Sequence, residues 1–128
     1  MNILLDTHVL IWLAISPQNL SQQATNMITD PTHTLFTSLV SIWEMQIKLQ
    51  LGKLTLNVSL TELIERQQQV NGLQILPIEL AHIFALDTLP NAHRDPFDRL
   101  LIAQAIVTQM PMLSIDAVFD SYPVQRLW

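Results

Sequence analysis

Four carboxylates spread along the chain occupy positions from which they could share one site. They are Asp6, Glu44, Asp98 and Asp116. Asp6 follows the apolar run at residues 3–5 and Asp116 follows the run at 112–115, so each comes directly after a predicted buried strand. Ligands of a parallel sheet bind beyond the carboxyl ends of its strands, so the two aspartates would face one crevice. The competing interpretation is that each aspartate only caps the helix that follows it.

Asp98 is expected in the first turn of a helix that packs on the core. Asp95 suits the N-cap of that helix and Pro96 its first position, so we assign Asp95 a structural role. A favourable interaction with the helix dipole explains a carboxylate at Asp98 only in part. Leu101 and Ile102 lie on the same helical face as Asp98, and this face is expected to point toward the core. A carboxylate that points inward needs a partner.

Glu44 is expected on a helix over residues 39–51. Its apolar stripe is predicted to contain Val40, Trp43, Ile47 and Leu51. Glu44 would lie at the edge of this stripe. The alternative to a role in a site is an ordinary surface ion pair with Lys48, one helical turn away.

Four carboxylates that meet in one pocket repel each other, and a hard divalent cation would relieve this repulsion. Magnesium prefers oxygen ligands, and one or two such ions can activate a water for attack on a phosphodiester. The sequence has neither an Asp-rich calcium loop nor a His-x-x-x-His zinc helix. A magnesium site is therefore the favoured prediction.

Short apolar strands alternate with amphipathic helices, which predicts an α/β fold with a mainly parallel central sheet. Thr7 and Ser38 are expected to cap helices, and Pro77 to open one. A polar loop is expected at residues 91–94. The predicted strands cover residues 3–5, 34–37, 73–76, 112–115 and 124–127, and the predicted helices cover 8–15, 20–29, 39–51, 60–69, 77–86 and 97–109.

The composition indicates one domain over residues 1–128 with a large apolar core. Hydrophobic residues make up 49% of the chain and charged residues 13%, so some apolar surface is expected to be covered by a partner or a second copy. The absence of cysteine excludes disulfides and thiolate metal sites. The N-terminus lacks the pattern of a signal peptide, and no apolar run is long enough to cross a membrane, which favours a cytoplasmic protein.

Four sequence blocks together resemble the PIN domain, specifically the bacterial toxin branch called VapC. The blocks are residues 4–8 (LLDTH), 41–44 (SIWE), 95–105 (DPFDRLLIAQA) and 114–116 (SID). The resemblance spans nearly the whole chain and implies a three-layer α/β/α fold. It also implies cleavage of RNA that depends on magnesium or manganese, with tRNA as the substrate suggested by the family. A further implication is inhibition by an antitoxin protein, and the protein would commonly be a homodimer.

The family's metal-site acids fall on Asp6, Glu44, Asp98 and Asp116, which would be both metal ligands and catalytic residues, and Ser114 falls where the family has a supporting Ser or Thr. On this scheme Asp6, Glu44 and Asp98 hold the principal ion and Asp116 completes the site. Hydrolysis would leave 5′-phosphate and 3′-hydroxyl ends.

The charge balance departs from that of a typical nucleic-acid binder, since the net charge is −5. If four of the eleven acids hold metal, the seven others face six Lys and Arg, which leaves −1. The best candidates for phosphate contacts are Lys48, Lys53, Arg94 and Arg99. The histidines (His8, His33, His82, His93) and tryptophans (Trp12, Trp43, Trp128) are expected in packing, surface or interface roles.

Two other classes of protein compete with this interpretation. A haloacid-dehalogenase-like phosphatase needs a second acid two residues after Asp6, where this chain has His8, and a receiver domain needs two adjacent acids. A non-catalytic PIN-like module that acts through protein contacts would suit the apolar composition. It gives no physical reason for keeping four carboxylates in facing positions.

Overall fold

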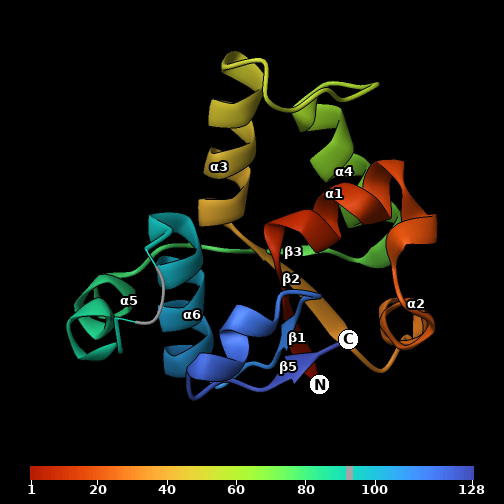
Figure 1. Cartoon of the computed structure of the whole chain (residues 1–128). Coiled ribbons are helices and arrows are strands. Elements are labelled where there is room, and N and C mark those ends of the chain that lie inside the picture. The colour runs from red at the N-terminus through yellow and green to blue at the C-terminus, as the bar shows by residue number, and fades with distance from the viewer. Residues whose placement is uncertain (92–93) are drawn as a thin grey trace.

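A central parallel sheet organises the chain. The computed structural model describes residues 1–91 and 94–128, and within these residues the sheet has five strands in the order β3-β2-β1-β4-β5 (Figure 1). Each neighbouring pair is parallel. The predicted α/β class is confirmed. The strands are β1 (Asn2–Leu5), β2 (Thr34–Ser38), β3 (Gln74–Leu76), β4 (Met112–Leu113) and β5 (Arg126–Leu127).

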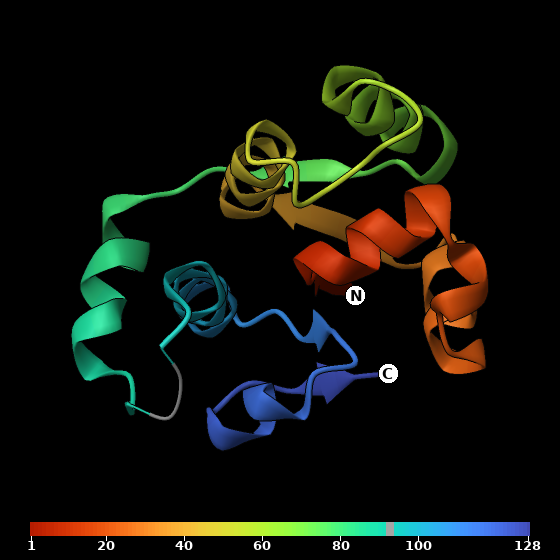
Figure 2. The same cartoon turned by 45° about the horizontal axis from the view of Figure 1, so that its top comes forward.

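Helices cover both faces of this sheet, which gives the three-layer arrangement expected of the fold (Figure 2). Two helices end at residues in the left-handed region, α4 at Gly72 and α6 at Gln109, and only the first of these has the glycine that this backbone conformation favours. The helices are α1 (Thr7–Ile15), α2 (Gln22–Thr29), α3 (Leu39–Gln50), α4 (Leu60–Asn71), α5 (Leu80–Ala85) and α6 (Pro96–Thr108).

The alternation of side chains along β1 divides the core into two parts. Ile3 and Leu5 pack on one face with residues of α1, α2 and α4. Leu4 packs on the other face with residues of α5 and α6. The side chains of Ile3, Leu4 and Leu5 are all fully buried. Both faces of the strand are covered, which explains why apolar and polar residues do not alternate along it.

Some predicted helix starts are displaced. Asp6, not Thr7, is the N-cap of α1, because Asp6 Oδ1 accepts from the Thr7 N–H at 2.7 Å. Pro77 does not open a helix, since α5 begins at Leu80. The predicted caps of α3 and α6 are confirmed, with Ser38 Oγ accepting from Val40 N and Asp95 Oδ1 from Phe97 N.

The buried face of α3 differs from the predicted apolar stripe. Trp43 and Leu51 are exposed, whereas the helix buries Val40, Ser41, Glu44 and Met45. The prediction was wrong because α3 packs partly on α6 and partly on α1, so its inner face includes two polar residues. Glu44 therefore lies inside the protein rather than at a solvated edge.

Part of the predicted loop at 91–94 lies outside the described residues, and so does His93. No helix of the described part of the chain is both long enough and apolar enough to cross a membrane.

The core position of α6 leads to a stability prediction. Ile102 is completely buried, whereas Val107 on the same helix is 42% exposed. Ile102→Ala should lower the free energy of unfolding by about 2–5 kcal/mol, because it leaves a cavity between α6 and the sheet. Val107→Ala should change it by less than about 0.5 kcal/mol. Urea denaturation checks both values, and equal effects would contradict this packing.

Candidate active site

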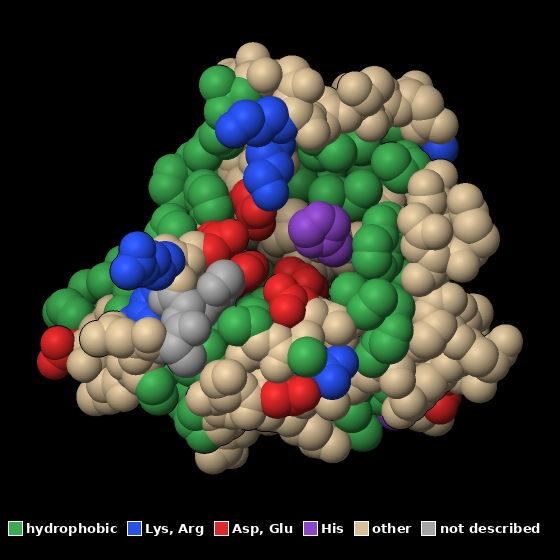
Figure 3. All heavy atoms as spheres, viewed as in Figure 1, with side chains coloured by type: hydrophobic (Ala, Val, Ile, Leu, Met, Phe, Trp, Pro, Cys, Tyr) green, Lys and Arg blue, Asp and Glu red, His purple; other side chains and the backbone are tan. Residues whose placement is uncertain are grey.

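Three of the four acids follow the carboxyl ends of β1, β2 and β4, at one edge of the sheet: Asp6, Glu44 and Asp116. Asp98 lies in the first turn of α6. The chain leaves β1 for β2 and β3 on one side and returns to β4 and β5 on the other, so the strand order reverses at β1. Ligands of open α/β sheets bind at such a reversal. Figure 3 shows Asp and Glu side chains gathered there around a hollow, with a histidine and basic side chains at its rim.

Asp6 lies at the centre of this edge and is only 4% exposed. Its Oδ1 accepts from the Thr7 N–H at 2.7 Å, and its Oδ2 accepts from the Ser114 hydroxyl at 2.8 Å. Burial raises the pKa of Asp6 above its ordinary value, and the charge of Glu44 adds to the rise, while Ser114, His8 and Thr7 oppose it. Asp6 is thus a buried acid with a second acid close enough to repel it.

Ser114 joins Asp6 to Asp116. The Ser114 hydroxyl that donates to Asp6 also accepts from the Asp116 N–H at 3.0 Å. Asp116 is exposed and caps the short 3₁₀ helix Ala117–Ser121, with Oδ1 accepting from Val118 N. Ser114 would support the site, as the resemblance implies, through these two hydrogen bonds.

Asp6 and Asp116 line a common pocket of about 380 Å³ together with His8, Trp12, Ile115 and Ala117. The His8 ring packs against Trp12 at 5.8 Å between centroids. His8 was expected only in a packing or surface role, and its place at the rim of the acidic pocket follows from its position in the first turn of α1.

Glu44 is the second buried acid, and neighbouring side chains bind both of its oxygens. Thr7 Oγ1 donates to Glu44 Oε1 at 2.9 Å, and the same hydroxyl is hydrogen-bonded to Ser41 Oγ at 2.8 Å. Lys48 Nζ donates to Glu44 Oε2 at 2.6 Å. The predicted ion pair with Lys48 is confirmed, but the carboxylate in it is buried rather than solvated.

Asp98 is half-buried in the first turn of α6. Its charge acts on the ammonium of Lys48, which is paired with Glu44. Glu44 raises the pKa of Lys48 most, by hydrogen bond and by charge, and the charges of Asp95 and Asp98 raise it further. Asp95 was expected only to cap the helix. It does so, and its charge also acts on the Lys48 ammonium.

The carboxylate oxygens of this edge suit a magnesium ion that keeps waters in its coordination shell better than a site made only of protein ligands. Among the described residues, no three Asp, Glu or His side chains stand close enough to hold an ion by themselves. Magnesium is commonly held by one or two carboxylates, with waters and substrate phosphates completing its shell. Two buried, oriented carboxylates, one of them with a pKa raised by burial and like charge, fit such an ion.

The hydroxyls of Thr7 and Ser41 were not predicted as functional residues. Both are buried: Thr7 donates to one oxygen of Glu44, and Ser41 is hydrogen-bonded to the Thr7 hydroxyl. The only signal in the sequence was their place inside the two blocks LLDTH and SIWE. Their contact joins residues 34 or more positions apart, which local patterns do not reveal.

His82 has the packing role expected of it. It is 2% exposed, its Nδ1 accepts from Glu79 N at 3.0 Å, and the same nitrogen lies 3.2 Å from Gln104 Nε2. Gln104 Oε1 in turn accepts from the hydroxyl of Ser38, the N-cap of α3. This network ties α5 and α6 to the start of the helix that carries Glu44.

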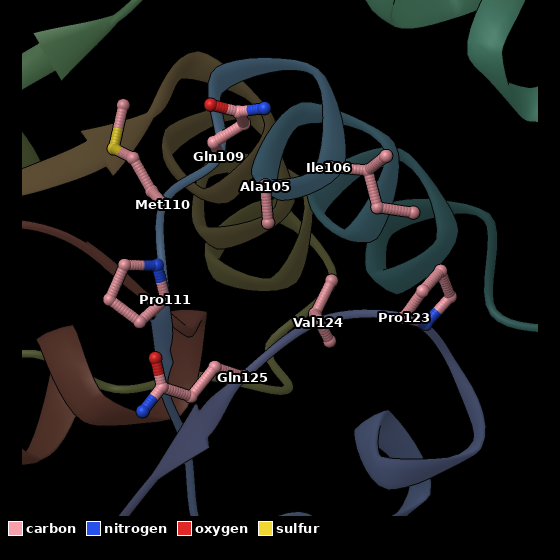
Figure 4. Close-up of a pocket in the computed structure, with 8 residues that line it drawn as sticks. All are labelled: Ala105, Ile106, Gln109, Met110, Pro111, Pro123, Val124 and Gln125. Carbon is pink, nitrogen blue, oxygen red and sulfur yellow. The ribbon is translucent and has the colours of Figure 1, made fainter.

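A pocket of about 320 Å³ at the other edge of the sheet lacks the chemistry of a catalytic site (Figure 4). Its lining comes from the end of α6 and from the segments that precede β4 and β5, so it lies at the amino ends of strands. None of the residues that line it is titratable: Ala105, Ile106, Gln109, Met110, Pro111, Pro123, Val124 and Gln125.

The burial of Asp6 predicts a gain of stability when its charge is removed. Because its pKa is raised in the folded protein, the stability that this group contributes is present below its ordinary pKa of 3.8 and is lost as the pH rises through the raised value. Asp6→Asn should therefore unfold at higher urea concentration than the wild type at neutral pH without divalent ions, and its stability should depend less on pH.

The exposed Asp87→Asn is the matched control and should leave the curve of stability against pH unchanged. An Asp6→Asn protein that is less stable than the wild type at neutral pH would contradict the inferred cost of this buried charge.

Comparison with known proteins agrees with this geometry. The profile of the PIN domain family matches residues 3–125. No curated protein sequence gives a significant match. A chain of VapBC2 from Rickettsia felis, bound to a promoter DNA fragment, superposes with a TM-score of 0.73 at 15% identity, over 99% of this chain and 98% of that one.

Two further solved structures share the fold. A chain of VapBC-1 from nontypeable Haemophilus influenzae has a TM-score of 0.68 at 14% identity, covering 99% of this chain and 97% of that one. A chain of FitAcB from Neisseria gonorrhoeae has a TM-score of 0.63 at 18% identity, covering 98% and 96%. The predicted resemblance is confirmed, and the chain belongs to the PIN domain family.

Proposed function

We propose that this protein is a metal-dependent endoribonuclease, the toxin of a bacterial toxin–antitoxin pair, acting in the cytoplasm. The observation that carries the proposal is the pair of buried, oriented carboxylates, Asp6 and Glu44, at the reversal point of a PIN-family sheet. The structures that share its fold include complexes named VapBC and a toxin-antitoxin complex from Klebsiella pneumoniae, which supports the toxin assignment.

In this proposal Asp6, Glu44, Asp98 and Asp116 share magnesium, or manganese in its place. At most two of these carboxylates would bind the ion directly, and waters would link it to the others. When bound, the ion supplies positive charge at the scissile phosphate and an activated water. The protein supplies orientation: Ser114 fixes one oxygen of Asp6, and Thr7 fixes one oxygen of Glu44. The ends produced are a 5′-phosphate and a 3′-hydroxyl, so the RNA 2′-hydroxyl takes no part.

The RNA is proposed to approach over the rim of this edge. Lys53 and Arg94 are exposed and are assigned to phosphate contacts. Arg99 also donates a hydrogen bond from Nη1 to the backbone carbonyl of Pro90 at 2.8 Å. Transfer RNA is the proposed substrate on the family resemblance alone.

The antitoxin and a second copy of the chain are the proposed partners. Several large apolar side chains of α3 and α5 are exposed, among them Trp43 and Phe84, which are 56% and 65% exposed. Next to them Val40, Trp43, Ile83 and Phe97 line an apolar pocket of about 300 Å³. Exposed apolar surface of this kind marks contact with another protein.

The proposed chemistry predicts loss of RNA cleavage when either buried acid becomes an amide. Asp6→Asn and Glu44→Gln should each lower the rate of magnesium-dependent cleavage by about 100-fold or more, because a neutral amide binds the ion poorly. Cleavage of bulk tRNA and total RNA, with and without magnesium, measures this directly. End-group analysis should find 5′-phosphates.

Glu62→Gln on the exposed side of α4 is the matched control and should cleave like the wild type. A wild-type protein that cleaves no RNA in any divalent ion, while still binding a partner protein, would favour the non-catalytic PIN-like module. Products with 2′,3′-cyclic phosphates would contradict the hydrolytic scheme.

A further inference from the structure

The ion pair between Lys48 and Glu44 differs from an ordinary pair on a helix surface. Its atoms lie 2.6 Å apart, and the Glu44 side chain is only 5% exposed while that of Lys48 is 36% exposed. The pair Glu62–Arg66 on α4 has the same spacing of four residues and a distance of 2.9 Å, but its side chains are 53% and 55% exposed. Screening by water makes such an exposed pair weak, whereas a buried carboxylate needs its partner.

Lys48 also stands among more than one acid. The charges of Asp95 and Asp98 act on its ammonium together with Glu44. Glu44 in turn acts on Asp6. The Lys48 ammonium therefore balances part of the charge of Glu44, Asp95 and Asp98, and it occupies the position where Glu44 would otherwise offer a free oxygen.

We propose that Lys48 is a built-in counter-cation that competes with the divalent ion for Glu44 and so sets the concentration at which the metal site fills. This inference depends on the proposed function, because it assumes that the acids hold metal. Thr7, which is itself hydrogen-bonded to Ser41, already donates to Oε1, so Oε2 is the oxygen for which the two cations would compete.

Repulsion between cations gives the direction of the effect. A divalent ion that binds Glu44 must either displace the Lys48 ammonium or lie close to it, and both weaken binding. In exchange, Lys48 stabilises the metal-free protein by neutralising a carboxylate that would otherwise be buried without a partner. Lys48 is thus a positioning residue, which acts through Glu44.

Binding of Mn²⁺ tests the proposal without reference to activity. Free Mn²⁺ is followed by its EPR signal during titration of the wild type, Lys48→Met and Arg66→Met. Lys48→Met should bind Mn²⁺ about tenfold more tightly, because the ammonium that repels the divalent ion is removed. Arg66→Met removes an exposed pair of equal spacing on α4, which carries none of the four site acids, and should bind Mn²⁺ like the wild type.

Thermal unfolding gives a second, independent readout. Lys48→Met should unfold several degrees below the wild type in EDTA and should gain more from added Mn²⁺ than the wild type does. If Lys48→Met does not fold, Lys48→Gln replaces it, since its amide still donates to Glu44 but carries no charge. Lys48→Arg keeps the charge and should retain affinity near that of the wild type.

The outcomes separate this inference from the proposed function. If the wild type and all variants fail to bind Mn²⁺, the metal-dependent function fails and the inference fails with it. If the wild type binds Mn²⁺ and Asp6→Asn does not, the metal site stands. An unchanged or weaker affinity of Lys48→Met and Lys48→Gln then overturns the competition alone.

Discussion

The burial of like charges at one edge of the sheet is the constraint on which the rest of the site depends. Asp6 and Glu44 are each 4% exposed and close enough for one charge to act on the other. Two such carboxylates are stable only if hydrogen-bond donors and cations surround them. Three residues meet that need from different parts of the chain: Ser114 just after β4, Thr7 at the start of α1, and Lys48 on α3. The contacts that stabilise the charges therefore also fix their orientation.

The strand order explains how distant residues reach this edge. Because β1 is the central strand, the residues that follow β2 and β4 lie on either side of Asp6. The helices then continue the arrangement: α1 starts at Thr7, which contacts Glu44 on α3, and α6 brings the charge of Asp98 to Lys48. The contact between Ser38, at the start of α3, and Gln104 on α6 holds these two helices together. A site built from several elements gains rigidity from the core beneath it.

The positions that could be predicted from the sequence are those that neighbouring residues determine. Asp6 and Asp116 follow short apolar strands, and Asp95-Pro96 opens a helix, so these positions could be placed from neighbouring residues. The burial of Glu44 could not, because it depends on α1 and α6 packing against α3 and on the exposure of Trp43. The start of α5 was misplaced for a different reason: its cap is a local contact between Glu79 and His82, and no proline signals it. Contacts between distant elements therefore explain the missed burial of Glu44, and a missed local cap explains the start of α5.

The net charge of the chain has to be judged together with the positions of its acidic residues. A net charge of −5 opposes RNA binding if every acid is exposed and ionised in the same way. Here two of the acids are buried, and one of them is already paired with a lysine. The four acids of the candidate site, Asp6, Glu44, Asp98 and Asp116, place negative charge where the proposed RNA phosphate would approach, and a divalent ion bound there would offset part of that charge. On the proposed function, filling of the metal site would therefore favour RNA binding as well as hydrolysis, because the same cation would weaken the repulsion of the phosphate.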